Sequence, residues 1–322
     1  MTTHDLHDEK TAIDFYDKRY ESGYMEEWDD IKKNKVKEVL SLLNLPETGK
    51  ALDFGCGNGV FTNIIKKALP NWDVYGVEIS SIAVKNASRK FPDCKFFEIS
   101  DAQTHLNTFD FLFSHHVIEH VQSLDETFQI INSYLKPSSS QLHILPCGNE
   151  NSFEYNISIL KKEGINKELE NRFFFEEPGH LRRLTTNQFI EHEQKIGFSL
   201  IKDFYSNQYD GAINWITKSS PRFVKKFTDN KDAINNDALL QLEKLRKQLL
   251  PLTYFQFPYS KYWAVKSKWR LTFIDNLKLT ILFLPAMISK IWSDKLDSKS
   301  AKEWKEKKTE KNGSEMFLFF KR

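Results

Sequence analysis

A glycine-rich turn between a short strand and a helix most constrains how this chain can fold. Residues 51–54 form an apolar run that predicts a buried strand, and the run breaks at Gly55, Gly57 and Gly59. A helical pattern follows at residues 60–69, with its apolar side chains on one side. Glycine has no Cβ, so the backbone can turn sharply there and approach a ligand closely. Strand, glycine turn and helix together indicate the first unit of a nucleotide-binding α/β sheet.

An acidic residue at the end of the next predicted strand strengthens this interpretation. Residues 72–77 indicate a second strand, and Glu78 follows it directly, 25 residues after Asp53. A carboxylate at the tip of the second strand can accept hydrogen bonds from both hydroxyls of a ribose. We therefore expect Glu78 to hold the sugar of a nucleoside-containing cofactor.

The run Asp53–Gly59 closely resembles motif I of the class I S-adenosylmethionine-dependent methyltransferases, an acidic residue followed by G-x-G-x-G. Nicotinamide enzymes normally carry G-x-G-x-x-G instead. The resemblance covers roughly residues 10–205, resumes at the C-terminus and includes the ubiquinone-pathway O-methyltransferase group. It implies S-adenosyl-L-methionine as the cofactor. The residues that it assigns to cofactor binding are Tyr16, Tyr20, Asp53, Gly55, Cys56, Gly57, Asn58, Glu78, Ile79, Asp101, Ala102, Ser114 and His115.

Some of these assignments have equally simple structural explanations. In the family, tyrosines of an N-terminal helix close over the carboxylate end of the cofactor, but core packing explains Tyr16 and Tyr20 as well. By resemblance, Asp101 bonds the adenine amino group, whereas an ordinary Asx turn is its alternative.

Strand-like and helical segments alternate along the rest of the first two thirds of the chain. Further strands are expected at residues 95–99, 109–114, 141–145 and 198–205, with the last at 315–322. Ser80, Ser123 and Thr185 are expected helix N-caps, and a turn is expected at 136–138. The alternation predicts right-handed crossovers. The predicted fold class is α/β, a Rossmann-like seven-stranded mostly parallel sheet with a helical insertion before the last strand.

Four segments make up the predicted domain organisation. Residues 1–48 are expected to form an N-terminal helical cap, 49–209 the cofactor-binding domain, 210–312 a helical insertion or lid, and 313–322 the final strand. The insertion is rich in aromatic residues and lysines. Its stretch 277–292 is too short and too interrupted for a transmembrane helix. We favour a lid, and a peripheral membrane contact through 277–292 is the alternative interpretation.

The segment after the fourth predicted strand carries the candidate chemistry. Residues 116–120 fit the zinc-peptidase pattern H-x-x-E-H, but they lie in a loop rather than on a helix. The ubiquinone-type enzymes bind a divalent metal through E-x-x-E-H, which Glu119 and His120 match, whereas His116 replaces the first glutamate. His180, in a later loop, completes a metal set of Glu119, His120 and His180. The favoured interpretation is metal-free, with His120 and His180 as catalytic residues, because histidine titrates near neutrality.

Composition and cysteine usage limit the cellular setting. The 322 residues are 40% hydrophobic and carry a net charge of +2 with mixed signs, so composition gives no case for a nucleic-acid partner. Three cysteines without a C-x-x-C pair indicate a reducing compartment rather than a disulfide framework. The polar N-terminus predicts no signal peptide. We expect a cytoplasmic protein, with peripheral membrane contact as the alternative.

These features predict a methyltransferase that acts on a small molecule, a sugar or a lipid-linked intermediate, most simply at oxygen. The sulfonium methyl is already activated, so catalysis consists of in-line alignment and proton removal. An RNA 2′-O-methyltransferase and a non-catalytic cofactor-binding protein are the alternatives. No arginine-rich groove segment favours the first, and a scaffold has no need of the intact glycine loop, Glu78 and Asp101.

Overall fold

The chain divides into two compact units, each assembled from separate segments. The computed structural model describes residues 9–21, 28–266 and 271–322, without the side chains of 9–14 and Ala102. The first unit comprises Met1–Cys147, Glu176–Phe204 and Glu315–Arg322, and the second comprises Gly148–Phe175 and Tyr205–Ser314. The sheet belongs to the first unit apart from the last two residues of β8 (Ser199–Ser206), and long helices dominate the second.

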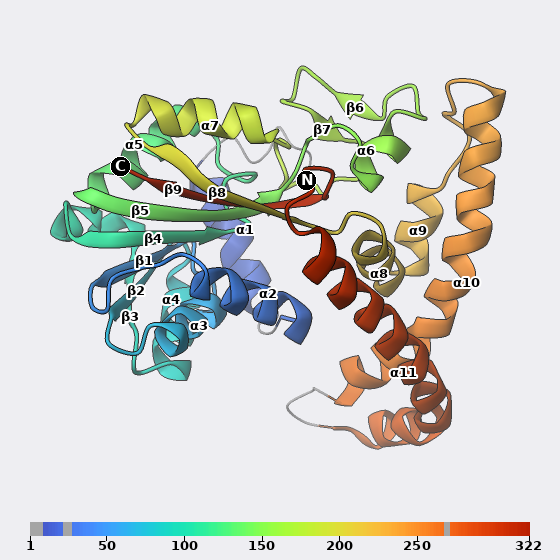
Figure 1. Ribbon diagram of the computed structural model, residues 1–322. Coiled ribbons are helices and arrows are strands. Elements are labelled where there is room, and N and C mark those ends of the chain that lie inside the picture. The colour runs from blue at the N-terminus through green and yellow to red at the C-terminus, as the bar shows by residue number, and fades with distance from the viewer. Residues whose placement is uncertain (1–8, 22–27, 267–270) are drawn as a thin grey trace. The chain divides into compact units, whose positions relative to one another are not determined.

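Within the described residues, seven strands form one sheet in the order β3-β2-β1-β4-β5-β9-β8 (Figure 1). Neighbours from β3 to β5 pair in parallel, and β9 pairs antiparallel to β5. This arrangement confirms the predicted α/β fold. The strand order reverses between β1 and β4, and such a reversal leaves a crevice at the carboxyl ends of the strands. The bounds are β1 (Lys50–Phe54), β2 (Asp73–Glu78), β3 (Lys95–Glu98), β4 (Phe109–His115), β5 (Leu135–Pro146), β8 (Ser199–Ser206) and β9 (Glu315–Lys321).

Helices cover both faces of this sheet, with α2 against α3 on one face and α5 beside α7 on the other (Figure 1). The central strand β4 is accordingly buried on both sides, as its continuous apolar sequence predicts. The bounds are α1 (Glu9–Glu21), α2 (Asp30–Ser41), α3 (Val60–Ala68), α4 (Ser81–Lys90), η2 (Ile99–His105), α5 (Leu124–Tyr134) and α7 (Thr186–Lys195).

The expected N-caps are confirmed. The side chains of Ser80, Ser123 and Thr185 accept hydrogen bonds from the backbone N–H three residues further on. At Thr185 the partner Gln188 also reaches back to the cap, which completes a reciprocal capping box. These short-range signals fix where α4, α5 and α7 begin.

Two local expectations differ from the structure. The predicted turn at 136–138 is wrong, because β5 begins at Leu135, directly after α5 ends at Tyr134. The register between β4 and β5 shifts between Phe109 and Phe111, and this bulge accommodates the extra residues of β5. The N-terminal helical segment consists of two helices, α1 and α2, with residues 22–27 outside the described part.

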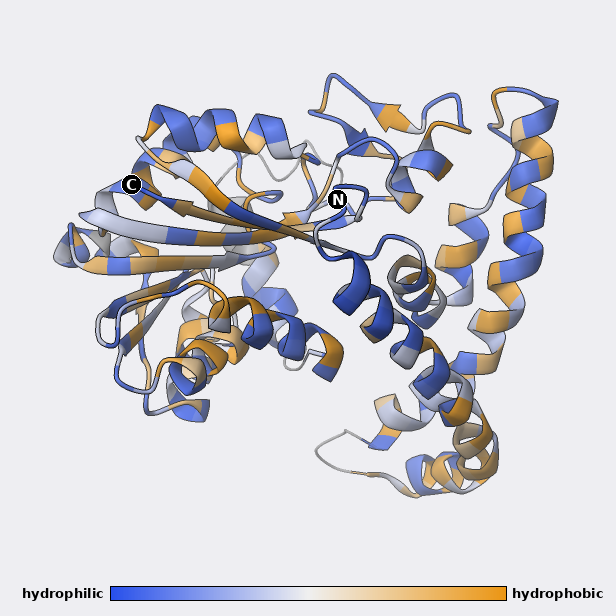
Figure 2. Ribbon diagram, in the orientation of Figure 1, coloured by the Kyte–Doolittle hydropathy of each residue, from blue (hydrophilic) through white to orange (hydrophobic). Residues whose placement is uncertain are grey.

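The second unit is a helical assembly with its own apolar core. Phe173, Ile216, Phe227, Leu242 and Leu249 are all buried together there. This division differs from the predicted boundaries at residues 148–175, because the aromatic side chains of that segment pack into the helical core. Figure 2 shows apolar residues along α10 and α11 as well. The bounds are α6 (Phe153–Ser158), β6 (Ile165–Asn166), β7 (Arg172–Phe173), α8 (Asp210–Lys218), α9 (Pro221–Phe227), α10 (Asn236–Lys266) and α11 (Phe273–Lys307).

Candidate active site

A cavity of about 730 Å³ lies in the first unit, lined from the carboxyl ends of β1, β2 and β4 and from helix α1. Its size falls in the range of small-molecule sites. Most of the residues that the sequence assigns to the cofactor line it, and so do both candidate catalytic histidines. The predicted residues in the lining are Tyr16, Tyr20, Asp53, Gly55, Cys56, Gly57, Asn58, Glu78, Ile79, His115, His120 and His180.

Two predicted cofactor residues do not belong to this lining. Ser114 is buried within the sheet, and its hydroxyl lies 2.7 Å from His143 Nδ1. Asp101 is exposed on η2, where its carbonyl accepts a hydrogen bond from the Thr104 hydroxyl. The side chain of Ala102 lies outside the described residues. The adenine contact expected of Asp101 therefore stays a prediction.

The glycine loop needs its glycines for both conformation and space. Gly55 and Gly57 have φ angles of +73° and +51°, a region that side chains disfavour. A Cβ on Gly57 would meet the Tyr20 hydroxyl at 2.9 Å, and one on Gly55 would meet Val117 Cγ2 at 2.5 Å. The loop thus lies directly against helix α1 and the segment after β4, and this close packing shapes the cavity wall.

Glu78 joins the second strand to the glycine loop. Its carboxylate accepts hydrogen bonds from the N–H groups of Gly57 at 2.9 Å and Ile79 at 2.8 Å. Burial raises the pKa of Glu78, and these N–H groups act in the opposite direction. Ser80 N also donates to Glu78 Oε1, at 3.3 Å, so Oε1 has two N–H donors and Oε2 has one. Because a carboxylate has about four acceptor positions, Oε2 can still receive a ribose hydroxyl. The residues present therefore fit the nucleoside part of S-adenosylmethionine.

Asp53 lies at the start of the loop and is almost fully buried. Burial raises its pKa to about 7, although the Thr62 hydroxyl donates to it at 2.6 Å and favours the ionised form. A cationic group brought beside this carboxylate would stabilise its charge. Asp53 is thus suited to the ammonium group of the cofactor's methionine part.

Removal of the Glu78 carboxylate is expected to weaken S-adenosylmethionine binding by at least about tenfold, because the ribose loses a charged acceptor in a buried site. Isothermal titration calorimetry of Glu78→Gln measures this effect while keeping the shape of the side chain. Glu98→Ala is the matched control, since Glu98 pairs with Glu78 in register on β3 but does not line the cavity. Unchanged affinity in Glu78→Gln would refute the assignment.

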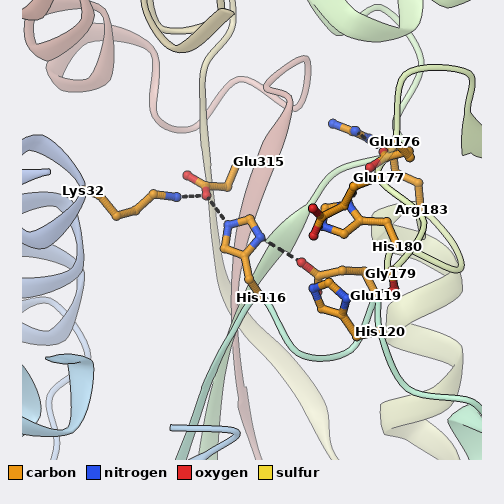
Figure 3. A network of polar contacts seen from close by, with 10 residues as sticks. All are labelled: Lys32, His116, Glu119, His120, Glu176, Glu177, Gly179, His180, Arg183 and Glu315. Atoms are coloured by element: carbon orange, nitrogen blue, oxygen red, sulfur yellow. Dashed lines mark hydrogen bonds and ion pairs between the residues drawn. The ribbon is translucent and has the colours of Figure 1, made fainter. Parts of the chain in front are cut away.

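The second half of the site joins the loop after β4 to the segment 176–183 (Figure 3). The imidazole rings of His120 and His180 lie 4.7 Å apart, so the expected approach of these histidines is confirmed. Glu119, His120 and His180 each offer a ligand atom, and these atoms all lie within 4.8 Å of one another. Leu181 N donates to Glu119 O at 2.9 Å, which ties the two segments together.

His120 is oriented by the backbone of the facing segment. Its Nδ1 donates to the Gly179 carbonyl at 2.8 Å, so the neutral ring leaves Nε2 with a free lone pair. Burial lowers the pKa of His120 to about 4, and the proximity of Glu119 only partly opposes this effect. His120 is therefore a neutral imidazole near pH 7, ready to accept a proton or to bind a metal.

His180 has the opposite electrostatic environment. Burial alone would lower its pKa, but the hydrogen bond from its Nδ1 to Glu176 outweighs burial and raises it. Glu176 in turn forms a buried ion pair with Arg183 at 2.5 Å, and Arg183 Nε donates to the Cys147 carbonyl at 2.9 Å. His180 is thus held in place by an anchored carboxylate, while its neighbour His120 stays uncharged.

His116 replaces the first glutamate of the metal motif, and the structure shows what it does there. Its backbone has a φ of +54°, and its side chain bridges Glu119 at 2.8 Å and Glu315 at 3.0 Å. Glu315 also pairs with Lys32, whose pKa burial lowers to about 7. Burial disfavours the charge of Glu119, but His116 and its hydrogen bond hold the pKa of that carboxylate at about 2. His116 therefore keeps Glu119 ionised (Figure 3).

Sequence reasoning missed several residues of this site. Lys32 and Glu315 come from opposite ends of the chain, and no local pattern connects them. Arg19 also lines the cavity, where it pairs with Glu177 at 3.3 Å. The adjacent arginines Arg182 and Arg183, close to the candidate His180, could have indicated a buried ion pair in this segment. Both are buried, and arginine is seldom buried unless it is paired.

The sheet order, the glycine loop after β1 and the acid after β2 define a class I S-adenosylmethionine-dependent methyltransferase. A family model described as a methyltransferase domain matches residues 25–202, more than half of the chain. The chain therefore belongs to this methyltransferase domain family.

Individual relatives match over shorter stretches. Trans-aconitate 2-methyltransferase of Variovorax paradoxus (strain S110) is 30% identical over 77 residues, 24% of this chain and 29% of that protein. The enzyme of the same name from Rhodopseudomonas palustris (strain HaA2) is 29% identical over 75 residues, 23% of this chain and 29% of its own. The chain thus spans less than a third of the length of these two curated relatives.

Among solved structures, phosphoethanolamine N-methyltransferase 2 of Haemonchus contortus, in complex with S-adenosyl-L-methionine, aligns with 17% identity and a TM-score of 0.44. That alignment covers 90% of this chain and 52% of the other.

Proposed function

We propose that this protein is an S-adenosylmethionine-dependent O-methyltransferase of a small molecule, in which His120 removes the acceptor proton. The observation that carries the proposal is the state of His120 in the cavity wall. Its Nδ1 is committed to the Gly179 carbonyl, and burial holds its pKa at about 4. An unprotonated Nε2 beside a glycine-loop cofactor site is what a general base for an acceptor hydroxyl requires.

The chain's own residues divide the work of this reaction. S-adenosylmethionine supplies an activated methyl group, so the acceptor oxygen forms a bond to the methyl carbon while the sulfonium carbon–sulfur bond breaks. His120 Nε2 takes the proton released from the hydroxyl. Glu119, kept ionised by His116, stabilises the imidazolium that forms, since a carboxylate close to a histidine favours its charged form. Glu78 and the glycine loop fix the cofactor, and His180 positions the acceptor.

The size of the cavity supports a small acceptor. The space of about 730 Å³ must hold both the cofactor and the acceptor, which suits a small molecule, a sugar or the head of a lipid-linked intermediate. The trans-aconitate methyltransferases among the relatives act, by their name, on a small molecule. We place the enzyme in the cytoplasm, because Cys56, Cys94 and Cys147 are free thiols, buried within the fold.

A metal-assisted reaction is a second candidate, and one observation favours it. Glu119 Oε2 is buried without a hydrogen-bond partner, and the ligand atoms of His120 and His180 lie within 4.8 Å. Two imidazoles and one carboxylate suit a first-row divalent ion, so these residues fit such an ion. His116 weighs against it, because it already occupies the other oxygen of Glu119.

A chelator distinguishes the two candidates in the assay that tests the activity itself. Methyl-labelled S-adenosylmethionine is incubated with pooled hydroxyl acceptors, and labelled product is counted with and without EDTA. We expect labelled product and no loss on chelation, because His120 needs no ion to accept a proton. Activity that falls with EDTA and returns with Zn²⁺ or Mn²⁺ would establish the metal site instead. Absence of product from every acceptor class would refute O-methylation.

A further inference from the structure

In two neighbouring helical stretches of the second unit, large apolar side chains are exposed and small or polar ones are buried, the reverse of a water-soluble helix. The two stretches are the end of α10, residues 254–266, and the first half of α11, residues 273–292, here called the apical hairpin. Its outer side chains are large and apolar: Phe273 is 83% exposed, Leu284 66% and Ile281 65%. Phe255, Ile288 and Ile291 are exposed as well. Helices of water-soluble domains normally bury such side chains.

The inner face of the apical hairpin is small and polar. Besides Asp275, the buried residues of α11 in the hairpin are Ala286 and Ser289, and Ser293 is buried directly after it. Ser289 Oγ accepts from Tyr259 N at 3.3 Å. In the α10 part of the hairpin, Gln256 is buried and donates to Thr217 Oγ1 at 2.6 Å. Small residues between closely packed helices and apolar residues outside them are typical of helices whose surroundings are lipid rather than water.

The exposed apolar surface is too extended to be incidental. Side chains from Phe255 to Trp292 contribute to it, on both helices. Monomeric proteins seldom expose contiguous apolar patches larger than a few hundred Å², and such patches mark contact sites. None of the described helices is both long and apolar enough to cross a membrane. The partner that covers this surface must therefore contact the exposed side of the helices and cannot be a membrane that the helices cross.

Charge around the patch identifies the partner. The described residues between 251 and 292 include the basic Lys261, Lys266, Lys278 and Lys290, against Asp275 as the acidic residue. Lys290 pairs with Asp294 at 2.5 Å. Asp275 is buried, and its carboxylate accepts hydrogen bonds from Thr272 in the capping box at the start of α11. A second copy of this surface would bring like charges together, whereas anionic lipid headgroups complement them.

Aromatic residues flank the apolar face in the manner of a bilayer interface. The ammonium of Lys266 lies 4.8 Å from the Trp263 ring, and that of Lys295 lies 4.9 Å from the Trp292 ring. Tryptophan and tyrosine concentrate at the headgroup level of membranes, where lysines reach the aqueous side. We propose that the apical hairpin binds the surface of an anionic lipid bilayer, with its apolar side chains inserted at the headgroup–acyl boundary.

Vesicle flotation of the full-length protein tests this proposal. We expect binding to phosphatidylcholine vesicles that contain about one quarter phosphatidylglycerol, and weak binding to vesicles of phosphatidylcholine alone. The triple variant Ile281→Ser, Leu284→Ser, Ile288→Ser should bind the anionic vesicles at least about a hundredfold more weakly, because three inserted aliphatic side chains are lost. Lys261→Gln and Lys278→Gln should each cost about fivefold.

The matched control is the double variant Ile234→Ser, Leu240→Ser, which removes exposed aliphatic side chains from the same unit outside the apical hairpin. It should bind like the wild type, and circular dichroism should show every variant folded, since the replaced side chains are exposed. Equal binding of the triple variant and the wild type would overturn the proposal. So would dimerisation through the patch in light scattering without vesicle binding, which would show a second copy as the partner. If the triple variant bound vesicles like the wild type but lost turnover on a water-soluble acceptor, the proposal would also be overturned. The apical hairpin would then act as a lid over the active site.

Discussion

Replacing His120 with alanine is expected to lower kcat by at least about a hundredfold, the usual contribution of a general base. Affinity for S-adenosylmethionine should stay unchanged, because the cofactor contacts expected of Glu78 and the glycine loop remain. Turnover is measured with labelled cofactor, and binding by calorimetry. In the wild type, kcat/KM should fall only as the pH drops through about 4, because burial lowers the pKa of His120 in the free enzyme to that value and the neutral ring is the active form. An exposed histidine would give an inflection near 6.5.

Two variants separate catalysis from positioning in this experiment. His120→Asn retains an N–H that can donate to the Gly179 carbonyl but offers no base, so it should be as inactive as the alanine variant. His192→Ala removes a histidine of α7 that pairs with Asp125 and does not line the cavity, and it should be fully active. Normal turnover in both His120 variants would exclude His120 as the base.

The parts of the fold that sequence could predict are those determined by neighbouring residues. The glycine loop, the strand before it and the acid after β2 lie within 28 residues, and each has a local physical reason. N-caps such as Ser80 and Thr185 were predictable for the same reason, since the bond that each makes spans three positions. The approach of His120 and His180 followed from topology, because the ends of neighbouring parallel strands meet at one edge.

The remainder depends on contacts between distant parts of the chain. His116 could be recognised as a departure from the metal motif, but not as the bridge between Glu119 and Glu315, 199 residues away from it. Residues 148–175 joined the helical unit through Phe173 and Phe175, whose aromatic pattern did not specify a partner. The inverted apical hairpin was equally hidden, because composition counts apolar residues without telling which side they occupy.

Breaking the buried pair between Arg183 and Glu176 is expected to cause the largest loss of stability. Both side chains are 3% exposed, and their charged atoms lie 2.5 Å apart. Arg183→Met would leave the Glu176 carboxylate in the interior without its cation, which typically costs about 3–5 kcal/mol of unfolding free energy. Turnover should fall as well, because the segment that carries His180 loses its anchor to the Cys147 carbonyl. Chemical denaturation followed by intrinsic fluorescence measures the change in unfolding free energy.

The pH dependence and two further variants distinguish this pair from simple loss of packing. Burial opposes ionisation of Glu176, but Arg183 and His180 outweigh it and depress its pKa to about 2. The pair therefore stabilises the fold above the ordinary glutamate pKa of about 4.3, and this contribution is lost as the pH falls towards 2. The deficit of Arg183→Met should shrink over that range.

Glu176→Gln combined with Arg183→Met should recover part of the loss, since no buried charge remains. Lys195→Met, which breaks the exposed pair with Asp125, should cost less than about 1 kcal/mol. A deficit in Arg183→Met that is as small as in Lys195→Met, or independent of pH, would contradict the role assigned to the buried pair.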